Sequence, residues 1–452
     1  MNLENIIEDL TDRGATYCDI RKEEWDRTSL TLKDSVPESI VQGEEEGAMV
    51  RVLYENGWGN VGTSNLDNLK ETADRAFEMA KKTNGFKKEE TGMADVETHR
   101  DEVEISMKDS FLDIGPEEKL ARLKEIEDKL DKDFVTSTDL RYRDNLVSKE
   151  IVNSDGTHIK MKIPRLVVYM IITGKSDTVQ RATESAGGTG GYELVDDAFN
   201  RIDVVLDRLE ALLEAGSPPS GQMPLIMDPH LTGVFTHEAF GHAAESDLVS
   251  SGNSCLKGKI GEKVAAEEIT IKDDPTLEGY GQFPYDDEGT KAKNRVLVKE
   301  GVLNDFILDR ESAWKLDMEP NGGARAEDFR VKPLVRMSNT LIEPGDMSFE
   351  ELVEGVDEGI YAKASSGGQV NTAQGTFQFN AQEGYLIDDG ELKKPIRDVS
   401  FNGFTLETLQ NIVGITDEVE DTIGHCGKGQ TASVGHGAPH ILISEVTVGG
   451  RE

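Results

Sequence analysis

The sequence contains little cysteine: Cys18, Cys255 and Cys426 are the three thiols among its 452 residues. Three cysteines cannot form the disulfide framework of a secreted protein, so a reducing compartment is indicated. Long hydrophobic runs are also missing, since no stretch approaches the roughly eighteen apolar residues of a membrane-spanning helix. The first residues are acidic and amphipathic, unlike a secretory signal. We therefore expect a cytoplasmic protein with no membrane association.

Basic side chains are scarce relative to acidic ones. The chain has 49 lysines and arginines against 87 aspartates and glutamates, which gives a formal net charge of −38. So acidic a surface repels nucleic acids and anionic membranes, and this disfavours direct nucleic-acid binding. Because the acids are spread along the whole chain, and because salt screens their repulsion, the composition is typical of a halophilic organism.

The length of the chain predicts two or three domains, because a single ordinary core does not extend so far. Before residue 215, helical and alternating apolar patterns both occur, including a predicted helix over 193–214. Residues 216–222, Gly-Ser-Pro-Pro-Ser-Gly-Gln, have the composition of a linker. Beyond them, hairpin patterns recur around Glu300-Gly301 and Asp389-Gly390. The predicted class is α+β: an N-terminal α+β domain (1–215), a linker (216–222) and a β-rich C-terminal domain (223–452).

The most informative stretch is Thr236-His-Glu-Ala-Phe-Gly-His242, which places two imidazoles beside a carboxylate. Proteins use these groups to hold zinc and to activate water. The stretch has one residue more than the H-E-x-x-H motif of zinc peptidases. In an ideal α-helix, His237 and His242 would lie about 140° apart, at roughly 100° per residue. A π-type turn would bring them nearly into line, and Gly241 can absorb the distortion, so we predict a distorted helix carrying both ligands.

A catalytic zinc ion commonly has three protein ligands and leaves its fourth position to water. With His237 and His242 as two of them, Glu238 is expected to be the general base. The residues alone leave the third ligand open, and the candidates are Cys426, His425, His436, His440, Glu245 and Asp247.

Each candidate for the third ligand also has a simpler interpretation. A thiolate is a strong zinc ligand, and Lys428 could help to hold the charge of Cys426, but a buried inert cysteine in a glycine-rich loop explains the same residues. Glu245 and Asp247 fit a solvated acidic turn at least as well. The histidines at 230, 436 and 440 have no informative spacing and are treated as ordinary surface or core residues.

A second glycine-rich stretch, Ser365–Val370, leads into an alternating strand pattern. Paired glycines beside a strand often mark a bulge or the close approach of another backbone. A peptide substrate could therefore pair with Gly367, Gly368, Gln369 and Val370 through main-chain hydrogen bonds, and a plain surface loop is the alternative.

Several blocks together resemble the TldD/PmbA metalloproteases, and within them the TldD branch. Thr236–Asp247 is similar to the TldD metal motif, and the second half adds the blocks Asp286-Asp-Glu-Gly-Thr290, Arg336-Met-Ser-Asn-Thr340, Gly367-Gly-Gln-Val370 and Cys426-Gly-Lys428. The first half matches more loosely, for example at Asn153-Ser-Asp-Gly156. The combination is specific, although each block alone is weak. The chain departs from the family after Cys426, where one residue is missing before Gly429-Gln430.

The resemblance implies a two-domain zinc peptidase that holds one Zn²⁺ per chain through His237, His242 and Cys426, with Glu238 as the catalytic acid and base. Such proteins act on peptides or unfolded polypeptide segments in the cytoplasm. They usually form a heterodimer with a PmbA-type (TldE) paralogue that lacks the metal motif. Because this chain has the motif, the resemblance implies the catalytic partner of such a complex, with a homodimer as the other possibility.

Two other functions fit the residues. A non-catalytic peptide-binding or scaffold subunit would contain no stoichiometric zinc. A metal hydrolase of small amides would cleave small amides in preference to peptides, although the long glycine-rich edge favours an extended chain as substrate.

Overall fold

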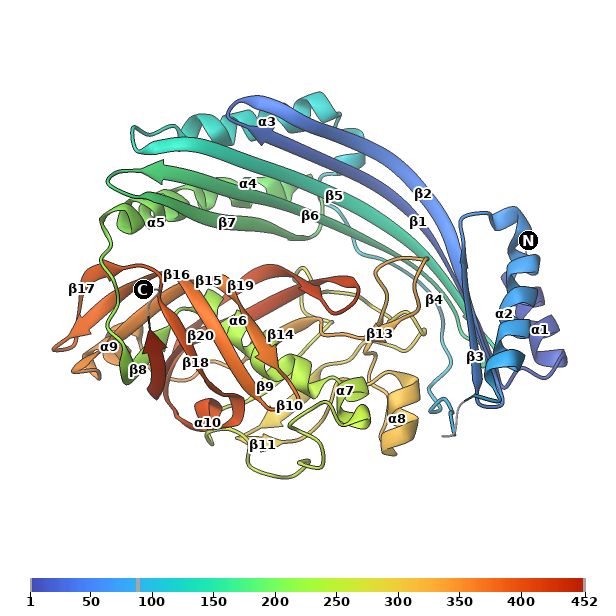
Figure 1. Ribbon diagram of the computed structural model, residues 1–452. Helices are drawn as coiled ribbons and strands as arrows, with labels where there is room; N and C mark the ends of the chain where they lie inside the picture. Colours follow the sequence, from blue (N-terminus) through green and yellow to red (C-terminus); the bar gives the residue numbers. More distant parts are fainter. Residues whose placement is uncertain (1, 87–89, 450–452) are drawn as a thin grey trace.

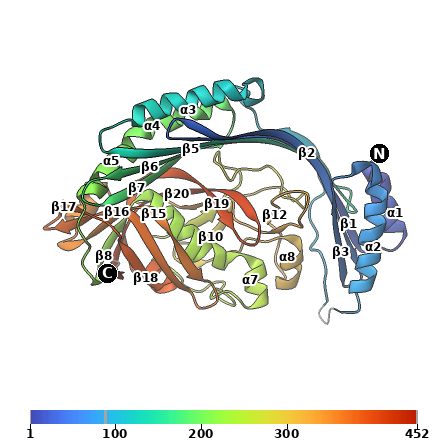
Figure 2. The same cartoon turned by 45° about the horizontal axis from the view of Figure 1, so that its top comes forward.

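The computed structural model describes residues 2–86 and 90–449. Their strands form a seven-stranded sheet, an eleven-stranded sheet and a small two-stranded sheet. Figure 1 shows the long strands of the first sheet arching over the C-terminal half, and Figure 2 shows the same arch from another side. No helix in the described ranges is both long and apolar enough to cross a membrane.

The seven-stranded sheet has the order β3-β2-β1-β5-β6-β4, with β7 also paired to β6. Neighbouring strands are antiparallel, except that β4 runs parallel to β6. The strands are β1 (Tyr17–Lys33), β2 (Val36–Tyr54), β3 (Gly57–Thr63), β4 (Arg100–Glu104), β5 (Val135–Asn153), β6 (His158–Lys175) and β7 (Val179–Thr189).

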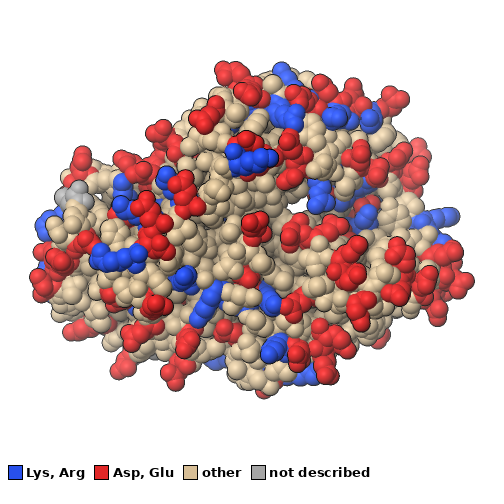
Figure 3. All heavy atoms as spheres, turned by 180° about the vertical axis from the view of Figure 1, so that it is seen from behind, with Lys and Arg blue, Asp and Glu red and all other residues tan. Residues whose placement is uncertain are grey.

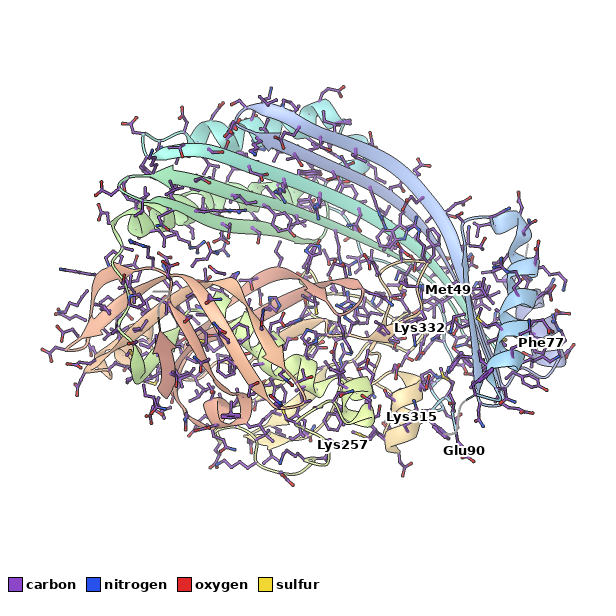
Figure 4. The ribbon with its side chains drawn as sticks, in the orientation of Figure 1. Met49, Phe77, Glu90, Lys257, Lys315 and Lys332 are labelled. Carbon is purple, nitrogen blue, oxygen red and sulfur yellow. The ribbon has the colours of Figure 1, made fainter. Side chains whose placement is uncertain are left out.

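Helices cover the outer side of this sheet at both ends. At one end, α1 and α2 bury an apolar stripe that includes Phe77, which Figure 4 labels; α3, α4 and α5 pack at the other end. The helix predicted over 193–214 is wrong as one element, because the chain turns at Arg201 between α4 and α5. These helices are α1 (Leu3–Asp12), α2 (Leu69–Thr83), α3 (Pro116–Leu130), α4 (Val195–Asn200) and α5 (Ile202–Glu214), with short 3₁₀ turns η1 (Leu66–Asn68), η2 (Phe111–Asp113) and η3 (Tyr192–Leu194).

The eleven-stranded sheet is mixed, because β14 runs parallel to β20 and β15 runs parallel to β8. The hairpins predicted around Glu300-Gly301 and Asp389-Gly390 are confirmed, and each glycine has the positive φ that such a turn needs. The strands are β8 (Gly221–Met227), β9 (Ile271–Asp273), β10 (Arg295–Lys299), β11 (Val302–Leu303), β14 (Asn339–Ile342), β15 (Glu358–Asn371), β16 (Thr376–Asp388), β17 (Glu391–Ile396), β18 (Ser400–Phe404), β19 (Ile412–Gly427) and β20 (Thr431–Gly449), while β12 (Ala324–Arg325) pairs with β13 (Leu334–Val335).

One helical segment runs across this sheet and carries the histidine motif. It begins with α6 (Pro229–Phe235), which Asp228 caps by accepting a hydrogen bond from the Leu231 N–H, and whose apolar side chains enter the core. It continues through η4 (Thr236–Gly241) and η5 (His242–Ala244) into α7 (Ser246–Ser251). The remaining helices are α8 (Arg310–Leu316), α9 (Phe349–Glu354) and α10 (Thr405–Gln410).

The two halves meet through buried polar contacts. The Arg21 guanidinium on β1 donates to the main-chain oxygens of Asp328 and Val331, at 2.8 and 2.9 Å. Figure 4 labels residues on both sides of this contact, namely Met49, the strand partner of Arg21, and Lys332. The division of the chain at 216–222 stays a prediction; β8 already begins at Gly221, and the isolated bridge Gly216–Ile396 lies just before it.

A candidate metal centre

The histidine motif forms a π-helical turn, which confirms the distortion predicted from its spacing. The element η4 is a π-helix, and the main-chain N–H of His242 donates to the oxygen of His237, five positions earlier. A side chain at Gly241 would place its Cβ 2.1 Å from the Met337 sulfur, so any larger residue there would displace the buried Met337 side chain. The insertion therefore brings both imidazoles to one side of the helix.

His237, His242 and Cys426 form a buried cluster. One ligand atom from each lies within 4.8 Å of the other two. The closest pair is the Cys426 Sγ and the His242 Nε2, 3.3 Å apart. Nitrogen and sulfur ligands of tetrahedral zinc, bonded at about 2.0–2.3 Å, lie roughly 3.4–3.8 Å from each other. The three side chains are thus close to a zinc-binding arrangement, with one histidine needing only a small movement.

His237 has an unusual environment for a buried polar side chain. Neither of its ring nitrogens has a hydrogen-bond partner among the described residues, although the side chain is 1% exposed. Burial and then the neighbouring His436, whose ring centre is 4.8 Å away, hold the pKa of His237 well below its usual range. Buried polar atoms in proteins almost always have partners, so a neutral imidazole left without one fits a metal ligand.

His242 is oriented by a second carboxylate, Glu245. Its Nδ1 lies 2.8 Å from the Glu245 Oε2, which leaves Nε2 to face Cys426. Burial alone would lower the pKa of His242, but the charges of Glu245 and Cys426 raise it well above its usual value. A carboxylate that fixes the tautomer of a histidine in this way is a common support for a zinc ligand.

Of the two acids expected in a solvated turn after the motif, Glu245 is buried, whereas the Asp247 side chain is 34% exposed. Glu245 is fully buried, because it packs under His242 and accepts a hydrogen bond from Lys428 at 3.1 Å. The same ammonium group lies 2.7 Å from Asp247. Lys428 therefore neutralises two carboxylates, and the expectation that it holds the thiolate charge is not supported by these contacts.

Cys426 lies in a strand and not in the glycine-rich loop that its neighbours suggested. It is the second-last residue of β19 and pairs with Ala432 of β20. The side chain of the preceding residue, His425, accordingly points to the other face, where its ring nitrogens contact the hydroxyls of Tyr169 and Tyr280. Burial, followed by the positive charges of two arginines, lowers the pKa of His425 to about 4.

His440 also lies outside the cluster, since its Nε2 contacts the Tyr361 hydroxyl. His436, in contrast, packs against His237 at the back of the site, although its spacing in the sequence gave no signal. Glu245, which the sequence offered as a possible third ligand or as a solvated acid, instead supports His242. Its position three residues after His242, one helical turn away, was the signal that could have identified it.

Glu238 lies beside the cluster at its more open side. Its side chain is 36% exposed, and its Oε2 is 3.7 Å from the His242 Nε2. Partial burial raises the pKa of this carboxyl. From this position the Glu238 carboxylate could accept a proton from a water molecule bound between the three side chains of the cluster.

The stretch Gly367–Val370 forms the outer part of β15. The β15–β16 pairing shifts register between Ser365 and Gly368, consistent with the bulge that was one of two interpretations of the paired glycines. On its other edge, β15 pairs with β8 only over Ile360–Ala362, so residues 365–371 have no second strand neighbour in the described part of the chain. Residues 366–369 on this edge are exposed, and the Ser365 N–H before them donates to the His230 Nδ1.

Comparison with known proteins agrees with this fold and cluster. The chain matches models for PmbA/TldA metallopeptidase domain 1 (residues 18–80), the central domain (109–213) and the C-terminal domain (220–450). The protein thus belongs to the PmbA/TldD metallopeptidase family.

Individual relatives are similar over nearly their whole length. A "Metalloprotease" of Methanothermobacter thermautotrophicus is 40% identical, with 99% of this chain and 98% of that protein covered. A "Zinc metalloprotease TldD homolog" of Saccharolobus solfataricus is 30% identical, with 97% of each covered. Among solved structures, TldE from Thermococcus kodakarensis has the same fold, with a TM-score of 0.81, 20% identity and 99% of each chain covered. The relatives lend no support to a halophilic source, which stays a prediction.

Proposed function

We propose that this protein is a TldD-type zinc peptidase, with one Zn²⁺ held by His237, His242 and Cys426. The observation that carries the proposal is the buried cluster of the three ligand atoms around His237, whose two ring nitrogens have no other described partner. Two imidazoles and a thiolate are a donor set that zinc prefers. The membership of this protein in the metallopeptidase family and the name of the Saccharolobus relative support the choice of metal.

The surrounding residues have separate roles in the proposed reaction. A bound zinc ion would supply Lewis-acid chemistry, by polarising the peptide carbonyl and lowering the pKa of a water molecule. Glu238 accepts the proton of that water and passes it to the leaving amine. Glu245 keeps His242 in the tautomer and orientation that present Nε2 to the cluster.

The proposed substrates are peptides or unfolded polypeptide segments. The free edge of β15, at Gly367, Gly368, Gln369 and Val370, supports this class because an extended chain can pair with it through main-chain hydrogen bonds. Such pairing does not depend on side chains, so it suits a peptidase that accepts many sequences. A folded protein offers few segments that can enter this edge.

We further infer a cytoplasmic protein that forms a complex with a PmbA/TldE-type paralogue, or otherwise a homodimer. The similarity in fold to TldE supports a pairing of two like-shaped subunits. The cluster of His237, His242 and Cys426 supports assigning this chain as the catalytic subunit of such a complex.

Two variants test the proposal, with zinc measured by elemental analysis and cleavage measured on a mixture of unstructured peptides. Glu238→Gln is expected to retain one zinc ion per chain and to lose cleavage, because general-base catalysis contributes about 10²–10⁴-fold. Cys426→Ala is expected to lose zinc as well. Cys255→Ala is the matched control, since Cys255 lies outside the cluster.

Two results would contradict the proposal. Wild-type protein without stoichiometric zinc would favour the peptide-binding or scaffold subunit. Undiminished cleavage by Glu238→Gln would remove the assigned base.

A further inference from the structure

The face of the seven-stranded sheet that looks toward the C-terminal half is rich in arginine. Tyr169 of β6 identifies this face, because its hydroxyl lies 2.8 Å from the His425 Nδ1. Strand residues that pair directly project to the same side of a sheet. The register pairs Tyr169 with Arg141, and Val167 with Arg143. It also pairs Thr173 with Arg181, so all three arginines share the face of Tyr169.

This face carries more basic than acidic groups, although Asp139 interacts electrostatically with Lys33 and Arg181 as well as with Arg141. Arg141 forms an ion pair with Asp139, 2.7 Å away on the same face. Lys33, which the register places on this face through its pairing with Asp139, forms no ion pair with any described residue, and the same holds for Arg143 and Arg181. Because the whole protein has a net charge of −38, a surface with more basic than acidic groups differs in the sign of its charge from the rest of the molecule.

The basic surface begins behind β19, the strand that carries Cys426. Arg141 is directly opposite Tyr169, and Arg143 is diagonal to it, which places their Cβ atoms about 5 Å and about 7–8 Å from that of Tyr169. Tyr169 contacts His425, the residue before Cys426. The exposed Arg143 therefore lies near His425, on the side of β19 opposite to the Cys426 side chain.

The space next to this face is open. Figure 3 shows the molecule hollowed between the arched sheet and the C-terminal half, with acidic side chains spread over the outer surface around the opening. A cavity of about 350 Å³ lies at this junction, lined by residues of β7, α4 and β19 and by His230. Its charged lining residues are Glu184, Asp197, Arg201 and Asp421, and the basic residues named above lie outside it. His230 also contacts the main chain of Ser365 on β15, at the start of the proposed substrate edge. The cavity thus joins the sheet to that edge.

We propose that this basic face, comprising Lys33, Arg141, Arg143 and Arg181, binds carboxylates of the peptide substrate. This inference rests on the proposed peptidase function and specifies the substrate class as acidic peptides. The carboxylates are either glutamate and aspartate side chains or the C-terminal carboxylate. Guanidinium groups bind carboxylates by paired, charge-assisted hydrogen bonds, and they would offset the repulsion of an acidic peptide by the outer surface.

Arg143 is the best residue for a test, because it is exposed and has no ion pair to lose among the described residues. Binding is measured by fluorescence anisotropy in the Glu238→Gln background, so that peptides stay intact. Three eight-residue peptides carry the same dye: one with central glutamates, one with glutamines in their place, and the glutamine peptide with an amidated C-terminus.

Arg143→Gln is expected to weaken binding of the glutamate peptide about two- to five-fold at low salt, the range for a solvent-accessible ion pair. Arg143→Glu is expected to have a larger effect, and Arg143→Lys a smaller one. Binding of the amidated glutamine peptide stays unchanged in all three, and the differences shrink in high salt. The control is Arg75→Gln, which removes an exposed arginine from α2 on the far side of the sheet.

The peptides separate the two sources of carboxylate. An effect confined to the glutamate peptide assigns the face to acidic side chains, and an equal effect on the unamidated glutamine peptide assigns it to the C-terminus. Equal binding of all peptides by all variants would overturn the proposal, as would no binding at all or the same loss in Arg75→Gln. Because binding needs no cleavage, an inactive wild-type protein would contradict the peptidase function alone.

Discussion

Replacing Glu245 by glutamine tests how the metal cluster is held in place. The carboxylate is fully buried, contacts the His242 Nδ1 at 2.8 Å and contacts Lys428 at 3.1 Å. Glutamine has nearly the same shape but removes the charge and permits a wrong tautomer of His242. Mutation of a group that orients a metal-bound histidine typically weakens metal binding about 10–100-fold, or about 1.4–2.7 kcal/mol. We expect Glu245→Gln to weaken zinc binding by that factor.

The assay is a zinc titration in competition with a coloured chelator at constant pH. The control is Asp247→Asn, because Asp247 binds the same ammonium group of Lys428 at 2.7 Å but is not a hydrogen-bond partner of His242. The control is expected to leave zinc affinity nearly unchanged. Equal zinc affinity in Glu245→Gln and wild type would refute the reasoning, and so would an equal loss in Asp247→Asn.

Two further predictions concern stability, measured by urea unfolding. Gly241→Ala forces a methyl group against the Met337 sulfur and is expected to destabilise the fold by about 1–3 kcal/mol; an unchanged midpoint would show that the π turn tolerates a side chain. Burial, and then the charge of Glu288, raises the pKa of Asp309 to about 7. The folded protein therefore holds this proton more tightly than the unfolded chain, and the stability of the fold falls as the pH rises through that value. Asp309→Asn keeps the oxygen that accepts from the Ser312 N–H, and it should gain more than about 1 kcal/mol relative to wild type between pH 4 and 8, because one pKa unit corresponds to about 1.4 kcal/mol. Parallel pH profiles of the two proteins would contradict this.

The parts that sequence could predict are those set by local spacing. In a regular α-helix, the spacing of His237 and His242 would not let both imidazoles bind one metal ion. The π turn was predicted from this spacing. The Glu300-Gly301 and Asp389-Gly390 hairpins follow from turn residues between alternating strands. In each case the deciding residues lie within a few positions of each other.

The parts that sequence could not predict depend on partners that are distant along the chain. Glu245 reads as an ordinary acid in an acidic turn until Lys428, 183 positions later, is packed beside it. The pairing of β1 with β5, which makes the long arch, and the parallel alignment of β14 with β20 have no local signature. Cys426 was reached through the family resemblance, because neither its spacing nor its glycine neighbours selected it over other candidates.

The position of Cys426 on β19 also determines when activity can arise. β19 is paired to β20, which in turn is hydrogen-bonded to β8, β14 and β18, strands that come from widely separated parts of the second half. The sulfur therefore reaches the two imidazoles only after the latest strands in the sequence have joined the sheet. In the proposed peptidase, the metal site would therefore assemble only after the β19–β20 hairpin has formed.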